Sequence, residues 1–206
     1  MEEVRDNDGL TEAEFLAEYN AAIYERPSVT VDIIIFKDNE VLLIKRGRHP
    51  GLGMLAFPGG FVDPNENVYK AAERELLEET HLKAINLRQI NVASEPNRDP
   101  RTRIITVPFL AQIEDGAELK ADDDAMSVSW YPFSVKATEL NGTTIYEVAI
   151  LDGSERKRFK VSKSTDKSGL IADPIYKQIG QSPLVGDHAE IFIRALDEFN
   201  ARNSNK

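Results

Sequence analysis

Glu78 and Glu79 stand three and four residues after Glu75, a spacing that could gather three carboxylates in one place. In an α-helix of about 3.6 residues per turn, side chains at this spacing share one face. Because like charges at such positions repel each other, the grouping favours a bound cation. Carboxylate oxygens in a chain without cysteine favour a hard ion, Mg²⁺ or Mn²⁺, over zinc. The alternative is a solvated helix face, since glutamate is a good helix former and is common on surfaces.

The residues around these glutamates follow a definite spacing. Five residues separate Gly60 from Glu66, and seven more lead to the run Arg74–Leu82, which reads RELLEETHL. This pattern resembles the Nudix box: glycine, five residues, glutamate, seven residues, then Arg-Glu-apolar-x-Glu-Glu-x-Gly-apolar. The one departure is His81, which stands where the box has its last glycine. That position closes the helix with a left-handed backbone, and histidine is among the non-glycine residues enriched in this conformation.

The resemblance implies an α/β fold, the Nudix α/β/α sandwich with a mixed β-sheet between helices, here with an added antiparallel hairpin. It also implies a Mg²⁺- or Mn²⁺-dependent hydrolase that cleaves a diphosphate linked to a nucleoside and to another group. The implied metal ligands are Glu75, Glu78, Glu79 and the carbonyl of Gly60. For catalysis we assign Glu78 as the acceptor of the water's proton, with Glu75 beside it and Arg74 holding a carboxylate in position. A loop residue outside the box remains a second candidate for the base.

A polar loop after the box carries several arginines. Residues 95–101 read EPNRDPR and lie between two expected strands. An Arg-Asp-Pro-Arg loop here resembles the Nudix branch that hydrolyses ADP-ribose, together with related ADP-ribose-sensing repressors and the Nudix halves of NAD-synthesising enzymes. The arginines expected to bind phosphate or ribose oxygens are Arg46, Arg48, Arg98, Arg101 and Arg103. The alternatives are solvated loop arginines and a surface turn in which Asp99 pairs with an arginine.

From these features we expect hydrolysis of ADP-ribose to AMP and ribose 5-phosphate. Two alternatives stay open: a Nudix hydrolase of another nucleotide sugar, dinucleotide or nucleoside triphosphate, and a non-catalytic ADP-ribose-sensing regulator. The expected partner is a small-molecule nucleotide. The net charge of −10 argues against nucleic acid as a partner, because binding a phosphate backbone needs clustered lysine and arginine. The resemblance further implies a homodimer.

The chain of 206 residues fits one domain. We divide it into an N-terminal helical extension (1–27), a Nudix core (28–135), and a hairpin arm with a C-terminal helix (136–206). The absence of cysteine excludes a disulfide framework and thiol catalysis. We see no secretory leader and no apolar run near the roughly 18 residues of a membrane span, so we expect a cytoplasmic protein without membrane contact.

The elements that must position the glutamates are a helix and the strands around it. Asn67 is the expected N-cap of the helix. Before it, Ser28–Phe36 and Glu40–Arg46 are rich in β-branched residues and together predict a hairpin. The strands expected after the helix are residues 85–93, 103–113 and 128–133.

Further patterns predict structure outside this core. Thr11 and Glu14 form a capping-box pattern at the start of a helix over Thr11–Tyr24, which we expect to pack on the core. The alternative is a cover over the substrate or a partner subunit. Thr143–Ile150 and Lys157–Val161 flank an Asp-Gly pair, which is typical of a hairpin.

The last predicted element is a C-terminal helix. Asp187 is its expected N-cap and Glu190 occupies the capping-box position. His188 is a candidate catalytic acid, but a lone histidine is more often structural, and we favour that role.

Overall fold

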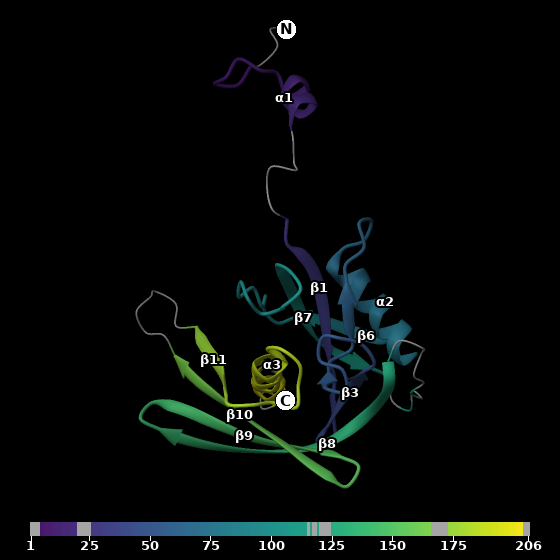
Figure 1. Ribbon diagram of the computed structural model, residues 1–206, viewed down its shortest axis with the longest axis vertical. Coiled ribbons are helices and arrows are strands. Elements are labelled where there is room, and N and C mark those ends of the chain that lie inside the picture. The colour runs from purple at the N-terminus through teal and green to yellow at the C-terminus, as the bar shows by residue number, and fades with distance from the viewer. Residues whose placement is uncertain are drawn as a thin grey trace.

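Two β-sheets and two long helices make up most of the described part of the chain, as the computed structural model shows (Figure 1). The structure describes residues 5–19, 26–114, 116, 119, 125–165 and 173–203. Its elements are α1 (Glu12–Glu18), β1 (Ser28–Ile34), β2 (Phe36–Lys37), β3 (Glu40–Arg46), β4 (Leu55–Ala56), β5 (Gly59–Phe61), α2 (Val68–Thr80), β6 (Ala84–Gln89), β7 (Ile104–Ile113), β8 (Ala125–Leu140), β9 (Thr143–Asp152), β10 (Glu155–Thr165), β11 (Pro174–Ile179) and α3 (His188–Asn203). This mixed arrangement confirms the predicted α/β fold.

The first sheet is mixed and lies between the two long helices. Its strand order is β5-β1-β7-β6, with β1 parallel to β7 and the other pairs antiparallel. Successive side chains of a strand point to opposite faces. Val31 and Ile33 therefore pack in one core cluster with Leu76 of α2, whereas Ile34 packs in the other cluster with Phe192 of α3.

The second sheet has more strands than the first and curves beside α3. Its order is β11-β10-β9-β8-β3-β2, with β4 paired to β3. The 16-residue strand β8 pairs with β3 in its first half and with β9 in its second, so it joins the core to the arm. In Figure 1, β8 to β11 form a curved layer beside α3. The predicted β9–β10 hairpin is confirmed.

The predicted hairpin between residues 28–36 and 40–46 is wrong in its first strand. Residues of β1 pair with β5 and β7 in the first sheet, and only Phe36 and Lys37 pair with β3. The run therefore changes sheets near Ile35. Both halves are apolar and β-branched, so composition alone does not reveal the change of partner.

α3 is held by an aromatic cluster and a polar one. The ring of Phe192 lies 5.2–5.5 Å from the rings of Phe36, Phe133 and Phe159. On the same helix Asp197 accepts hydrogen bonds from three arm side chains. These donors are Tyr146 at 3.0 Å, Tyr176 at 2.7 Å and Lys163 at 2.7 Å. Burial raises the pKa of both tyrosines, so they remain protonated donors.

α1 has the predicted capping box but not the predicted packing. The Thr11 hydroxyl accepts from the Glu14 amide at 3.2 Å, and the Glu14 carboxylate accepts from the Thr11 amide at 2.8 Å. None of the helix residues is buried, with Leu16 61% exposed, and Figure 1 shows α1 apart from both sheets. The expected docking on the core is therefore wrong for the described part of this segment; residues 20–24 lie outside it. No helix in the described ranges has the length and apolar character needed to cross a membrane.

We predict that Phe192→Ala lowers the free energy of unfolding by about 3–5 kcal/mol, because it removes a fully buried ring from the cluster around α3. Denaturant unfolding measures this loss. Phe15→Ala, at an aromatic side chain that is 46% exposed, is the matched control and should change stability by less than about 0.5 kcal/mol. Equal losses in both variants would contradict this assignment of the core.

Candidate active site

Helix α2 carries the glutamates and has well-defined ends. The Asn67 side chain accepts hydrogen bonds from the amides of Tyr69 and Lys70, both at 3.0 Å, which confirms the predicted N-cap. His81 closes the helix with φ of 61°, and its amide donates to the Leu77 carbonyl at 2.9 Å. Histidine therefore adopts the left-handed turn expected at the position of the missing glycine.

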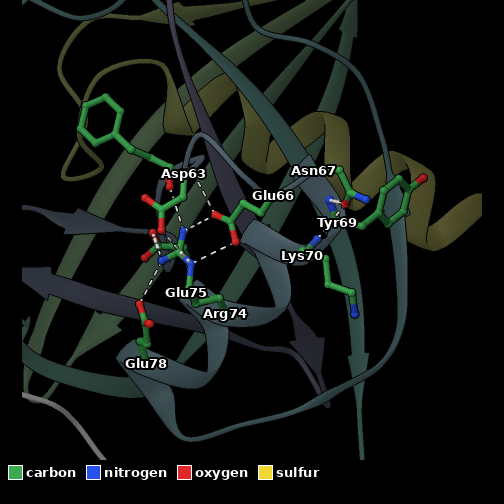
Figure 2. Close-up of polar contacts among 9 residues, drawn as sticks. Asp63, Glu66, Asn67, Tyr69, Lys70, Arg74, Glu75 and Glu78 are labelled. Atoms are coloured by element: carbon green, nitrogen blue, oxygen red, sulfur yellow. Dashed lines mark hydrogen bonds and ion pairs between the residues drawn. The ribbon is translucent and has the colours of Figure 1, made fainter.

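Arg74 gathers the carboxylates (Figure 2). It donates to Glu66 at 2.5 Å and 3.2 Å, to Glu75 at 2.8 Å and to Glu78 at 3.0 Å. It also donates to the Phe61 carbonyl at 2.9 Å. A guanidinium offers five N–H donors in a rigid plane, so one side chain can hold several acceptors. We define the carboxylate cluster as Glu66, Glu75, Glu78 and Glu79.

Two glycines let the chain pass close to this cluster. A Cβ at Gly60 would lie 2.3 Å from a Glu75 carboxylate oxygen, and one at Gly59 would lie 2.1 Å from the Val31 carbonyl oxygen. At Gly59 the backbone of β1 leaves no room for a side chain, and at Gly60 a side chain would displace the Glu75 carboxylate. The Gly59 amide then donates to Glu79 at 2.9 Å, which ties the last glutamate to strand β5.

Two glutamates of the carboxylate cluster, the partly buried Glu75 and Glu79, have raised pKa values. Burial raises the pKa of Glu79 to about 7, and the neighbouring Glu75 and Asp32 carboxylates act in the same direction. Burial also raises the pKa of Glu75, against the lowering effect of Arg74. Hydrogen bonding to Glu66 is the main cause of the raised pKa of Arg74, which therefore stays charged. Arg74 offsets the negative charge of Glu66, Glu75 and Glu78. Among the described residues Glu79 has no cationic hydrogen-bond partner and accepts from the Gly59 amide.

The donor set fits a hard divalent cation. Its donors are carboxylate oxygens, and the Glu75 carboxylate lies against Gly60, whose carbonyl is the expected fourth ligand. A cation would also offset the repulsion that raises the pKa of Glu79. Within the described ranges, three acidic or histidine side chains do not meet at ligand spacing. Glu78 is instead turned to Arg74.

A cavity of about 590 Å³ opens beside the cluster. This volume is within the range of small-molecule sites. Its polar lining consists of Thr30, Asp32, Arg46, Arg48, Glu79, Arg98, Asp99, Arg101, Asp187 and His188, with the backbone of Gly59 and Gly60. The cavity therefore brings Glu79 and Gly60 together with four of the five predicted arginines.

The arginines differ in how they are held. Arg46 donates to the Pro50 carbonyl at 2.8 Å. Arg101 pairs with Asp99 at 2.8 Å and lies 5.6 Å from the Phe61 ring, so the loop contains the ion pair weighed as an alternative. Arg103 donates to the Glu95 carbonyl at 3.2 Å and does not contribute to the cavity lining, contrary to our expectation for it.

Arg98 is engaged inside the protein. Its side chain is 7% exposed, and its guanidinium donates to both Asp187 oxygens at 2.8 Å and 2.7 Å. The predicted capping box of α3 is wrong for this reason: the Asp187 carboxylate is bound to Arg98, and Glu190 accepts from the Gln178 amide. Long-range partners have replaced the local ones that the spacing predicted.

Asp32 is the site residue that our reading of the sequence missed. It lies in β1 on the face opposite Val31 and Ile33, is 8% exposed, and accepts from the Thr106 hydroxyl at 2.6 Å. The signal in the sequence was a single acidic residue inside a β-branched run. His188, expected to be structural, lies 3.5 Å from Asp32 in the same cavity.

Comparison with known proteins finds a matching family model and related sequences. Residues 26–143 match the family model described as NUDIX domain. An ADP-ribose pyrophosphatase of Methanocaldococcus jannaschii is 45% identical over 109 residues, which are 53% of this chain and 64% of that protein. The ADPR responsive transcriptional repressor NtrR of Acinetobacter baylyi is 38% identical over 109 residues, which are 50% of this chain and 44% of that protein. The chain thus spans less than two thirds of the length of either relative.

Two solved structures share the fold. A MutT/nudix family protein from Enterococcus faecalis superposes with a TM-score of 0.65 at 30% identity, covering 92% of this chain and 69% of that one. The NUDIX domain of Shewanella oneidensis NrtR, complexed with ADP ribose, gives a TM-score of 0.54 at 30% identity and covers 60% and 84% of the two chains.

We predict that Gly60→Ala weakens Mg²⁺ or Mn²⁺ binding about 10- to 100-fold, because the new methyl group must displace the Glu75 carboxylate. Titration calorimetry measures the affinity. Gly142→Ala is the control: φ there is +78° but nothing lies within 4 Å, so backbone strain lowers stability without changing metal affinity. Unchanged metal binding in Gly60→Ala would contradict the role of this contact.

We predict that, with a chelator present, the melting temperature falls between about pH 5 and pH 8 through the Glu79 carboxyl. The folded-state pKa of about 7 lies above the ordinary 4.5, so this contribution is fully present below the ordinary value and is lost as pH rises through about 7. Glu79→Gln should flatten the dependence. Identical profiles for the two proteins would show that Glu79 is not the titrating group.

Proposed function

The chain belongs to the Nudix family, and we propose that it is a Mg²⁺- or Mn²⁺-dependent hydrolase that converts ADP-ribose to AMP and ribose 5-phosphate. One observation carries this proposal. A single cavity of about 590 Å³ is lined by Glu79 and Gly60, at the carboxylate cluster, and by Arg46, Arg48 and Arg101. A diphosphate needs both, because its negative charge must be met by cations while a water is deprotonated beside it.

The choice of ADP-ribose is supported by the relatives. The protein from M. jannaschii is named an ADP-ribose pyrophosphatase, and the domain from S. oneidensis was solved with ADP ribose bound. Within this chain, arginines from β3 and from the 95–103 loop reach the same cavity, which suits a substrate with two phosphates. A small nucleotide is therefore the proposed partner.

In the proposed reaction the glutamates hold the metal and move a proton. Glu75, Glu78 and Glu79 with the Gly60 carbonyl are the proposed ligands. A bound Mg²⁺ or Mn²⁺ supplies charge neutralisation at the diphosphate and acidifies a water. We keep Glu78 as the proton acceptor, because its side chain is 58% exposed, against 13% for Glu75, and can return the proton to solvent.

The arginines divide into binding and positioning roles in this proposal. Arg46, Arg48 and Arg101 are the proposed phosphate-binding side chains, since all three line the cavity. Arg98 lines it too, but both Asp187 oxygens occupy its guanidinium, so it positions the 95–103 loop. Arg74 positions Glu66, Glu75 and Glu78 rather than touching substrate.

A second candidate is an ADP-ribose-binding regulator without hydrolysis. It is favoured by the similarity to a repressor from A. baylyi and to the ADP-ribose-bound NUDIX domain from S. oneidensis. Catalysis remains our proposal because all four glutamates of the carboxylate cluster are present, three of them held by Arg74 and Glu79 held by the Gly59 amide. A homodimer is part of the proposal.

We predict that, in the presence of Mg²⁺, ADP-ribose is hydrolysed faster than NADH, a diadenosine polyphosphate, GDP-mannose or deoxynucleoside triphosphates, with AMP as product. Chelator should stop the reaction. Glu79→Gln should lower kcat/KM at least about 100-fold, because it removes a charged ligand of the metal. Glu73→Gln, at a 48% exposed side chain of the same helix, should keep activity within about twofold.

The panel separates the candidates. If another nucleotide derivative is hydrolysed fastest, the ADP-ribose assignment fails. If nothing is hydrolysed while ADP-ribose raises the melting temperature, the regulator replaces the enzyme. Equal losses in the two glutamate variants would reject the assigned cluster.

A further inference from the structure

Two buried polar side chains in the cavity lining take no part in the proposed hydrolysis. Asp32 and His188 come from β1 and from the first residue of α3, and each is 8% exposed. Both line the cavity that contains Glu79 and the arginines. Burying a carboxylate without a full set of partners costs free energy, so its place beside a ligand cavity calls for an explanation.

His188 presents an N–H group to Asp32. Its Nδ1 accepts a hydrogen bond from the Phe57 amide at 3.2 Å, and its ring stacks on the Phe57 ring with centroids 5.2 Å apart. Because Nδ1 is an acceptor, the ring proton resides on Nε2. Nε2 lies 3.5 Å from an Asp32 carboxylate oxygen, which is longer than an ordinary hydrogen bond.

One carboxylate oxygen of Asp32 accepts a short hydrogen bond, whereas the other has only a long contact. Its Oδ2 accepts from the Thr106 hydroxyl at 2.6 Å. Its Oδ1 faces the His188 Nε2–H at the long distance of 3.5 Å. The Arg98 guanidinium, which is bound to Asp187, interacts with the Asp32 charge as well. The pair therefore offers a ligand one strong acceptor and one N–H donor side by side.

The negative charge of Asp32 disfavours phosphate as the ligand of this pair. Asp32 is close enough to Glu79 to raise the pKa of that carboxyl by repulsion, so an added anion would be repelled. The cationic groups of the cavity are the arginines, which suit phosphate. A neutral hydroxyl group suits the pair, because it can donate to the carboxylate and accept from the imidazole N–H.

We propose that Asp32 and His188 bind the hydroxyl groups of a ribose in the substrate. This inference rests on the proposed function, because ADP-ribose joins a diphosphate to two riboses. A hydroxyl donates to Asp32 Oδ1 and accepts from His188 Nε2–H. A ligand without that hydroxyl leaves both buried groups unsatisfied, which is an effective means of discrimination.

Titration calorimetry tests this inference by comparing the affinity for ADP-ribose with the affinities for two analogues. A chelator is present to prevent turnover. The ligands are ADP-ribose, the β-methyl ester of ADP, which has the same charge but no terminal ribose, and 2′-deoxy-ADP-ribose. We expect the wild-type protein to bind ADP-ribose about 10- to 100-fold more tightly than one of the two analogues. The methyl ester identifies the terminal ribose as the bound sugar, and the deoxy analogue identifies that of adenosine.

Two variants remove the pair in different ways. Asp32→Asn keeps the shape and an acceptor for Thr106. His188→Asn keeps an acceptor for the Phe57 amide and removes Nε2. Each should reduce the affinity ratio to less than about threefold. Asp99→Asn removes another carboxylate of the same cavity, one that is paired with Arg101, and should leave the ratio unchanged.

The outcomes separate this inference from the proposed function. A wild-type ratio near one, or an unchanged ratio in both Asp32→Asn and His188→Asn, overturns the inference even if ADP-ribose is hydrolysed. The inference is also overturned if Asp32→Asn and His188→Asn change the affinities for ADP-ribose and for both analogues by the same factor. A wild-type preference that is lost in the variants supports the ribose site even if the hydrolysis assay fails.

Discussion

The structure depends on how several carboxylates are kept together in a partly buried place. Carboxylates repel one another, and removal from water makes each charge more costly. Arg74 offsets this for Glu66, Glu75 and Glu78, since its fixed plane of donors reaches all three and the Phe61 carbonyl as well. Glu79 has no such cation among the described residues and takes an amide from Gly59 instead. The proposed metal would supply positive charge on this Glu79 side of the cluster, where Arg46 acts only as a neighbouring charge.

The same constraint explains the geometry around the cluster. Gly59 lies against the backbone of β1, which leaves no room for a side chain, and a side chain at Gly60 would displace the Glu75 carboxylate. Asp32 pairs in register with Gly59 and points to the opposite face of the sheet from Val31 and Ile33. One short stretch of sheet therefore has helix α2, with its carboxylate cluster, on one side and the Asp32–His188 pair on the other.

The second half of the chain completes the cavity. Asp187, just before α3, holds Arg98, and His188, the first residue of α3, stacks on Phe57. The helix is itself anchored through Phe192 and through Asp197, which accepts from the arm strands. The arm, for which the sequence suggested no chemical role, thus helps to fix two side chains of the cavity. Residues of β9, β10 and β11 do not line the cavity, so these strands act on it through their packing and hydrogen bonds with α3.

The sequence by itself determined the local features. The box spacing, the Asn67 cap, the His81 turn and the β9–β10 hairpin depend on neighbours within a few residues, and the structure has all of them. The tertiary structure decided what depends on distant partners: the parallel pairing of β1 with β7, the ion pair of Arg98 with Asp187, and the meeting of Asp32 with His188. Local patterns carry no record of these contacts, because a strand can find its partner anywhere along the chain. A polar side chain likewise binds the nearest complementary group in space, and that group is set by the packing of the sheets around α3.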